Sequence, residues 1–488
     1  MQNATPTKGI RMGNKLQETL QFDDLAKRRV ECDFSGGMLS SDGGLVLLRD
    51  MDKRLNLTQR LADCFVDTRD QRFVEHSVRE LIAQRLLGLC LGYEDLNDHN
   101  SLRQDPLFAV GVDKNEPTGT DRLCPQDKGN ALAGASTLNR LELGSEKGSA
   151  RYRKIKPQQE MLESLLIKMG VETLSPETTE VVLDFDATDD IIHGLQEQRF
   201  FNAYYGDYCY MPLYCFAGDV PLWAQLQPSH IDASSGTVEA LEKIVPVIRS
   251  QCPDARIIVR GDSGFCRETI LAWCEANNVF YVMGLARNSR LLGLLESTMF
   301  RARLKACLTG GYAREFGEFL YQTRESWSKL RRVIGKAEIL SKGENPRFIV
   351  TNLPTDGFAP EQRERFAAAP CYEDFYCARG NMENRIKEQQ LDLFADRTST
   401  HYMNPNQLRL WFSTFAYLLL QRLRSLALHG TQLAKATAGT IRLKLLKIAA
   451  HITVSCRRIY IRFVSAFPLR DIFSLAHRRI RAFPNFGT

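Results

Sequence analysis

The sequence predicts an α/β core with a mixed sheet, interrupted by a β-rich segment and flanked by helical regions at both ends. Three observations support this prediction. Short β-branched and apolar runs alternate with amphipathic segments between residues 181 and 285. Further β-rich runs occupy residues 300–368, and helical apolar spacing dominates on either side of these regions. At 488 residues, the chain is long enough that we expect several structural units.

The composition excludes several classes of protein. Hydrophobic residues make up 44% and charged residues 25%, which is ordinary for a globular protein in water. We find no apolar run of membrane-spanning length, and the start of the chain lacks the layout of a signal peptide. Thirteen scattered cysteines without a Cys-x-x-Cys pair favour reduced thiols in a cytoplasmic protein over a disulfide framework or a zinc site.

Positive charge is concentrated at the C-terminal end. The formal net charge is +6, and residues 441–488 contain ten Lys or Arg against one acid, Asp471. A basic end on a nearly neutral body predicts a polyanionic partner such as DNA. The alternative interpretation of such a charge run is a solvated helix face.

The first part of the chain has the pattern of a helical module. Val78, Leu81, Ile82 and Leu89 share one face of a predicted helix, which Gly92 ends. The acidic segment that follows fits no calcium loop, so we interpret it as a helix boundary. We assign residues 1–165 to an N-terminal helical region and expect it to bind DNA.

The core elements follow one another in a characteristic order. Predicted strands and helices alternate as Val181–Asp186, Tyr208–Phe216, Val220–Leu226, a helix at Thr237–Arg249, Arg256–Arg260, a helix at Glu268–Ala276, and Val279–Met283. Ala217–Asp219 has hairpin character, and Pro246 should kink or shorten its helix. The order β-β-β-α-β-α-β is typical of a ribonuclease-H-like fold, which we assign to residues 166–300.

Carboxylates follow two of these strands, and a third comes from a later helix. The first strand runs into Asp184 and Asp186, and Arg256–Arg260 ends in a turn where glycines flank Asp262. Open α/β sheets place functional sites at such strand ends. Glu383 lies on a predicted helix downstream, in one polar stripe with the basic residues four positions before and after it.

Three motifs in this order resemble those of a known family. They are Asp-x-Thr at 186–188, Arg-Gly-Asp-x-Gly-Phe at 260–265, and Tyr-(x2)-Arg-(x3)-Glu at 376–383. Together they resemble bacterial insertion-sequence DDE transposases of the group named for a Tyr-Arg-Glu-Lys signature. In this group, a β-rich insertion splits the ribonuclease-H-like core before the glutamate. The resemblance covers roughly residues 175–400, but Gln390 stands where the signature has Lys.

The resemblance implies a catalytic site made of Asp186, Asp262 and Glu383, with Asp184 as the alternative first acid. These carboxylates would hold two Mg²⁺ ions, for which Mn²⁺ can substitute. Magnesium prefers hard oxygen ligands, so no His or Cys is required.

Four further residues are implied to contact DNA. Tyr376 and Arg379 would contact phosphates near the cut end, and Lys387, one turn before Gln390, is the candidate replacement for the signature Lys. Trp327 would stack on a flipped base. Packing of this Trp on a sheet is the alternative.

The function implied is cut-and-paste transposition of an insertion sequence in the bacterial cytoplasm, in association with the nucleoid. The partners would be double-stranded DNA with terminal inverted repeats and target DNA, bound by a homodimer. Residues 301–368 would form the β-rich insertion, 369–400 the second part of the core, and 401–488 a basic helical region for DNA contact and dimerisation. Two alternatives are an inactive DNA-binding derivative and a nuclease or resolvase without strand transfer.

Overall fold

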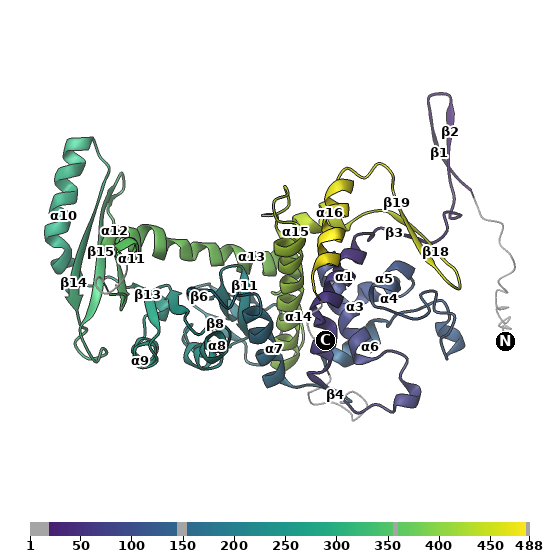
Figure 1. Cartoon of the computed structure of the whole chain (residues 1–488), viewed down its shortest axis with the longest axis horizontal. Helices are drawn as coiled ribbons and strands as arrows, with labels where there is room; N and C mark the ends of the chain where they lie inside the picture. The colour runs from purple at the N-terminus through teal and green to yellow at the C-terminus, as the bar shows by residue number, and fades with distance from the viewer. Residues whose placement is uncertain (1–18, 144–153, 355–359, 485–488) are drawn as a thin grey trace, which may run out of the picture.

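The structure is a computed structural model that describes residues 19–143, 154–354 and 360–484. The molecule is elongated, with the β-rich insertion at one end, the core in the middle and a helical unit at the other end (Figure 1). Among the described residues, no helix combines the length and apolar character needed to cross a bilayer.

A nine-stranded mixed sheet forms the core, in the order β11-β10-β6-β12-β13-β17-β15-β14, with β16 paired to β15. Its first five strands are β6 (Glu180–Ala187), β10 (Leu213–Ala217), β11 (Val220–Gln225), β12 (Arg256–Gly261) and β13 (Phe280–Leu285). Strand β10 runs antiparallel to both β6 and β11, whereas β12 runs parallel to β6 and β13. This order confirms the predicted ribonuclease-H-like core and its β10–β11 hairpin.

Three helices lie beside these strands, and one of them corrects an expectation. They are α7 (Gln159–Val171), α8 (Thr237–Gln251) and α9 (Glu268–Ala276). Helix α8 continues past Pro246, so our prediction that this residue shortens the helix was wrong. Pro246 is exposed while Val245 and Ile248 are buried, so burial of the inner face holds the helix together despite the missing backbone hydrogen bond.

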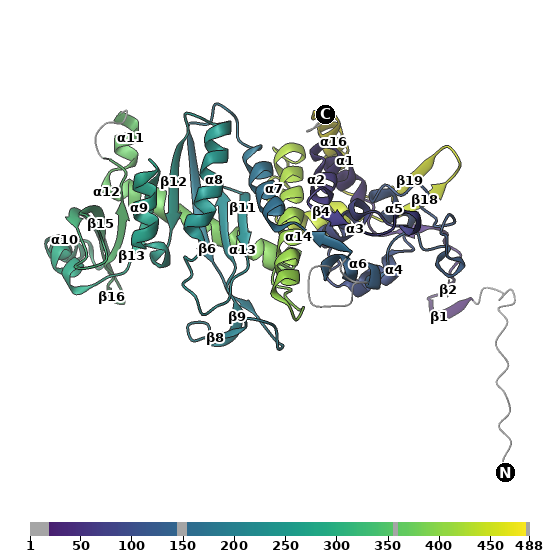
Figure 2. The ribbon, with the colours of Figure 1, turned by 90° about the horizontal axis from the view of Figure 1, so that it is seen from below.

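A small sheet projects from the core between β6 and β10. It consists of β7 (Asp190–Ile191), β9 (Asp207–Tyr210) and β8 (Phe200–Asn202), in that order. Figure 2 shows it standing away from the main sheet, below β6 and α13.

The β-rich insertion extends the core sheet. It contains α10 (Ser289–Thr309), β14 (Ala313–Tyr321), β15 (Arg331–Leu340), β16 (Gly343–Glu344) and β17 (Arg347–Thr351). Strand β17 pairs antiparallel with β13, which makes the two sheets continuous. Helix α10, which we did not predict, packs on β14 and β15 and contains the expected boundary at residue 301.

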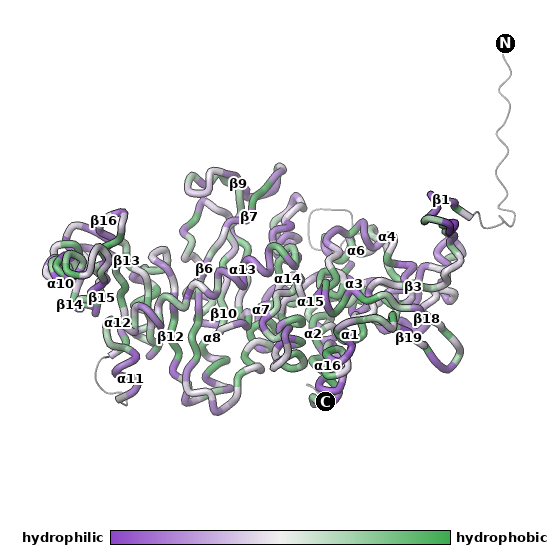
Figure 3. The backbone as a smooth tube through the Cα atoms, turned by 90° about the horizontal axis from the view of Figure 1, so that it is seen from above, coloured by the Kyte–Doolittle hydropathy of each residue, from purple (hydrophilic) through white to green (hydrophobic). Residues whose placement is uncertain are grey.

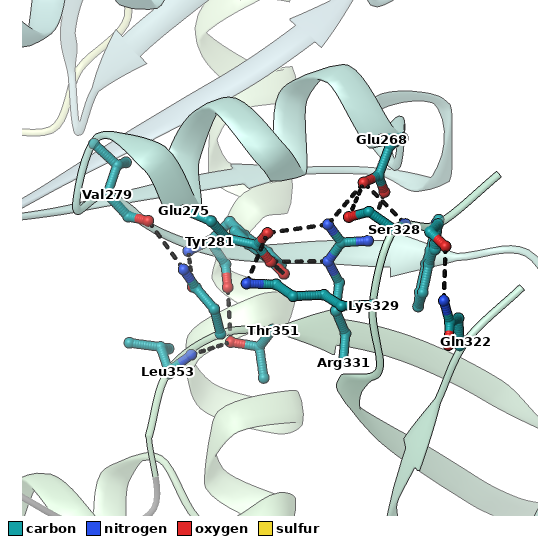
Figure 4. A network of polar contacts seen from close by, with 12 residues as sticks. Glu268, Glu275, Val279, Tyr281, Gln322, Ser328, Lys329, Arg331, Thr351 and Leu353 are labelled. Carbon is teal, nitrogen blue, oxygen red and sulfur yellow. Dashed lines mark hydrogen bonds and ion pairs between the residues drawn. The ribbon is translucent and has the colours of Figure 1, made fainter.

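A buried ion-pair network fastens the insertion to the core (Figure 4). The Arg331 side chain on β15 is only 2% exposed and lies 2.6 Å from Glu268 and 2.8 Å from Glu275, both on α9. The Tyr281 hydroxyl of β13 donates a hydrogen bond to the same Glu275 carboxylate (2.8 Å). Each charge therefore has an opposite charge beside it.

A long, irregular helical segment follows the insertion and returns across the core. It comprises α11 (Pro360–Arg365), α12 (Ala368–Pro370), a π-helical turn (Cys371–Tyr376), a 3₁₀ turn (Cys377–Arg379) and α13 (Gly380–Leu393). Met382, Ile386 and Leu393 are buried, so α13 turns one apolar stripe inward. Figure 1 shows α13 crossing the core toward α14.

The two flanking regions pack together into one helical unit around α14 (Met403–Arg422). Helix α14 is buried along most of its length, between β11 of the core and α3 of the N-terminal region. The other helices of this unit are α1 (Leu45–Leu55), α2 (Leu57–Ala62), α3 (Val78–Leu91), α4 (His99–Leu102), α5 (Pro106–Gly111), α6 (Ala135–Glu142), α15 (Ala438–Ile441) and α16 (Arg470–Ala482). Gly92 ends α3 with a left-handed φ of 91°, as expected.

Some strands occur within these helical regions. Strands β18 (Ala450–Val454) and β19 (Ile459–Phe463) form a hairpin where we expected helix, and β18 also pairs with β3 (Leu39–Ser40). The alternation of buried and exposed residues at the start of β18 has the two-residue period of a strand. The remaining short strands are β1 (Leu20–Leu25), β2 (Arg28–Cys32), β4 (Phe65–Asp67) and β5 (Ile155–Pro157).

Candidate active site

Asp186 lies near the end of β6, at the edge where the candidate site forms. It is paired in register with Tyr214 of β10, and its side chain is 17% exposed. The buried residues Val181, Leu183 and Phe185 fix the strand on its other face. Because side chains alternate along a strand, Asp186 is on the same face as Asp184.

Asp184, the alternative first acid, is committed to an ion pair. Both of its carboxylate oxygens accept hydrogen bonds from the Arg260 guanidinium on the neighbouring strand β12, at 2.6 and 2.7 Å. The same guanidinium also donates to the carbonyl of Phe375. A bidentate, buried pair of this kind is strong and directional. Asp184 therefore orients the strands, while Asp186 remains more open to solvent.

Asp262 follows β12 and caps the turn that comes next. Its side chain accepts a hydrogen bond from the backbone N–H of Gly264 at 2.7 Å. A Cβ atom at Gly261 would stand 2.8 Å from Phe265, and one at Gly264 would stand 2.9 Å from the Asp262 carboxylate. The glycines on either side therefore allow the tight turn that presents this carboxylate, as the sequence predicted.

Glu383 comes from α13, and Arg379 joins it to the strand acids. One Arg379 Nη atom lies 3.5 Å from the Glu383 carboxylate and 3.8 Å from that of Asp186. The guanidinium carbon of Arg379 is also 5.9 Å from the centre of the Tyr376 ring. The structure therefore brings Tyr376, Arg379 and Glu383 together with the acids of the core sheet.

The pKa of Asp186 responds to the charges of both other candidate carboxylates. Burial raises the pKa of Asp186 to about 6, and the nearby charges of Asp262 and Glu383 act in the same direction. Arg379 opposes this shift. Carboxylates that repel one another in a partly buried site favour the binding of a cation.

The donor chemistry of this site fits a hard divalent cation. Its three candidate ligands are all carboxylates, and Mg²⁺ prefers oxygen ligands of this type. Within residues 19–143, 154–354 and 360–484, however, no group of three or more His, Cys, Asp or Glu side chains is placed so that it could hold a metal ion. The Arg379 guanidinium lies between Asp186 and Glu383 in this structure.

The other predicted residues are placed differently. Lys387 is exposed on α13. The Gln390 side chain donates a hydrogen bond to the backbone carbonyl of Asp189 (3.0 Å), so it holds the chain just after β6. Trp327 is 6% exposed, with its ring 5.7 Å from that of Tyr321 and 5.2 Å from the Arg331 guanidinium. This burial agrees with the sheet-packing alternative and leaves little of the indole ring accessible for stacking.

Gly284 on β13 also shapes the site, although we did not predict it from the sequence. A Cβ atom there would stand 2.6 Å from the Tyr376 hydroxyl and 2.8 Å from the Ser263 backbone nitrogen. The absence of a side chain thus lets Tyr376 pack against the turn that carries Asp262. A glycine within an apolar strand was the available signal, because it often marks a close approach of another group.

Comparison with protein families identifies the class to which this chain belongs. The chain matches the family described as transposase DDE domain, group 1, over residues 22–485, and it belongs to this family of DDE transposases. Among solved structures, it is similar to the piggyBac transposase in a synaptic complex with hairpin DNA, studied by cryo-EM. The TM-score is 0.40 and the sequence identity 10%, over 90% of this chain and 81% of that chain. A comparison with curated proteins gave no match.

Proposed function

We propose that this transposase cuts DNA at the ends of an insertion sequence and joins the freed ends to target DNA, with Asp186, Asp262 and Glu383 as its catalytic residues. The observation that supports this most is their convergence from β6, from the end of β12 and from α13, around Arg379. The first and the last of these carboxylates, Asp186 and Glu383, are 197 residues apart in the sequence.

The proposed chemistry assigns a role to each group. The three carboxylates would hold two Mg²⁺ or Mn²⁺ ions, which would supply activation of the attacking oxygen and stabilisation of the leaving oxygen at phosphorus. Arg379 then moves from its carboxylate partners to a phosphate oxygen, for which a guanidinium is well suited. Tyr376 orients Arg379 through their ring contact, and Lys387 contacts the DNA backbone from its exposed position on α13.

We further propose that the helical unit and the basic residues after Ile441 bind the inverted-repeat DNA and pair two copies of the chain. The charge of this segment supports the assignment. By the resemblance described above, this would take place on nucleoid DNA in a bacterial cytoplasm. Binding of this type should weaken steeply as salt increases, because counterions are released. An affinity independent of salt would show that this basic segment does not bind DNA.

The test is cleavage and strand transfer on DNA that carries the inverted repeats flanking the coding region. We expect both reactions to require Mg²⁺ or Mn²⁺ and to be lost in Asp262→Ala, while DNA binding persists. Asp254→Ala, at an exposed turn of the same core, is the matched control and should retain activity. Normal strand transfer by Asp262→Ala would refute the assignment. Cuts without joined products would support the alternative of a nuclease without strand transfer.

A further inference from the structure

Exposed aromatic rings gather on the small β7–β9–β8 sheet. Phe201 is 56% exposed, Tyr204 88% and Tyr208 45%. This sheet projects from the core on the side where α13 crosses β6 (Figures 2 and 3). Large aromatic side chains rarely gather on a free surface unless that surface binds something.

The rings are arranged as a surface rather than as a packed cluster. Phe201 and Tyr208 are cross-strand partners, with ring centroids 5.6 Å apart and planes at 71°. The Arg199 guanidinium lies over the Tyr208 ring at 4.8 Å, and the rings of Tyr204 and Tyr205 are perpendicular at 4.9 Å. The planar groups Arg199, Tyr208, Phe201 and Tyr204 thus follow one another along the hairpin from its base to its tip.

This surface adjoins the candidate active site. Strand β7 begins at Asp190, four residues after Asp186, and β9 leads into β10, the strand paired with β6. Burial raises the pKa of Tyr205 to about 12, and the negative charges of Asp189 and Asp186 contribute to this shift. Tyr205 therefore lies near the acids at the end of β6. A strand of DNA that leaves the carboxylates on this side would meet the rings.

We propose that Phe201, Tyr204 and Tyr208, with Arg199, form a stacking platform for unpaired nucleotides of the DNA strand at the active site. This inference rests on the proposed function, because it takes that strand as the substrate. Bases stack on aromatic side chains whatever their sequence, and Arg contributes through its planar cation.

The chemistry of the surface favours an unpaired strand over duplex DNA. Binding of a duplex depends on many contacts between cations and phosphates, but the segment 190–210 contains a single Lys or Arg, which is Arg199. An unpaired strand exposes base faces that match such rings. Trp327 cannot serve in this role as it stands, because it is buried in the insertion.

The experiment measures the affinity of the full chain for a fluorescent dT8 oligonucleotide and for a duplex of similar length, both in EDTA. In the double variant Tyr204→Ala/Tyr208→Ala, we expect the affinity for the single strand to fall about 10- to 100-fold. The duplex affinity should change less than about twofold, because few phosphate contacts are lost. The paired Tyr→Phe variants keep the rings and should bind as the wild type does. Phe300→Ala/Tyr312→Ala removes two rings of similar exposure near α10 and is the matched control.

Several outcomes would overturn the platform. The first is an unchanged affinity for the single strand in the Tyr204→Ala/Tyr208→Ala variant. The second is an equal loss of affinity in the Phe300→Ala/Tyr312→Ala control. The third is wild-type affinity in Tyr204→Leu/Tyr208→Leu, which would indicate general apolar contact. A thermal melt shows whether each variant is folded. Because binding in EDTA needs no catalysis, failure of the platform is distinguishable from failure of the proposed function, which the cleavage assay of Asp262→Ala tests.

Discussion

The candidate active site and the insertion anchor are both clusters of acids around one arginine, but they differ in how fully their charges are satisfied. At the anchor, burial acts to raise the pKa values of Glu268 and Glu275. The hydrogen bonds and charge of Arg331, together with hydrogen bonds from their other neighbours, outweigh burial and lower both values. At the site, burial and like charges raise the pKa of Asp186 to about 6. The first arrangement stabilises the fold, whereas the second costs stability and keeps carboxylates available for chemistry.

The largest expected effect is the loss of DNA cleavage on substitution of Asp186. Asp186→Asn keeps the size of the side chain but removes its charge as a metal ligand. We expect cleavage to fall by about three orders of magnitude or more, because several kcal/mol of metal-dependent stabilisation are lost. A cleavage time course at saturating Mg²⁺ measures this. Activity within about tenfold of the wild type would move the first catalytic acid elsewhere, with Asp184 as the next candidate.

The next effect concerns the anchor. Arg331→Ala leaves Glu268 and Glu275 without their shared cation, and we expect the free energy of unfolding to fall by about 3–5 kcal/mol. Urea titration followed by tryptophan fluorescence measures it, since Trp327 lies beside this residue. Arg72→Ala, whose side chain is 81% exposed in a surface pair, should leave the urea midpoint nearly unchanged. Equal effects of the two substitutions would mean that the buried Arg331 pair stabilises the fold no more than the surface pair does.

A smaller effect is expected at the glycine beside the site. Gly284→Ala places a methyl group against Tyr376 and Ser263, and we expect a loss of stability of about 1–3 kcal/mol together with reduced cleavage. Gly293→Ala in helix α10 is the control, because a Cβ atom there meets nothing within 4 Å. It should be neutral or should stabilise by up to about 1 kcal/mol. If Gly284→Ala were as stable and as active as Gly293→Ala, the close approach of Tyr376 to residue 284 would not matter for stability or cleavage.

The smallest effect is a pH dependence of stability. Because the pKa of Asp186 is raised on folding, its carboxyl stabilises the fold fully below pH 3.8, and this contribution is lost as pH rises through about 6. At pH 7 in EDTA, Asp186→Asn should therefore be more stable than the wild type by about 1–2 kcal/mol. The difference should vanish near pH 3.5. Thermal melts across this range measure it, and a constant difference would mean that Asp186 is not strained by its neighbours.

Local patterns in the sequence were sufficient to predict many elements. The short β-branched and apolar runs of Val181–Asp186 and Arg256–Arg260 predicted strands whose ends carry carboxylates. The four-residue spacing of Arg379, Glu383 and Lys387 predicted one polar helix face. These predictions succeeded because side-chain period and turn chemistry are properties of adjacent residues.

The sequence by itself thus determined the order of the core elements, the acids at the strand ends and the motifs of the family. Pairing between distant segments decides which acid is available for chemistry. Asp184 is hydrogen-bonded to Arg260, 76 residues away, whereas Asp186 has only the longer contact with Arg379. Packing also buries Trp327, joins the insertion to the core sheet, and leaves exposed rings such as Tyr204 on the β8–β9 hairpin. These features depend on strand pairing and packing between distant segments, which no local period encodes.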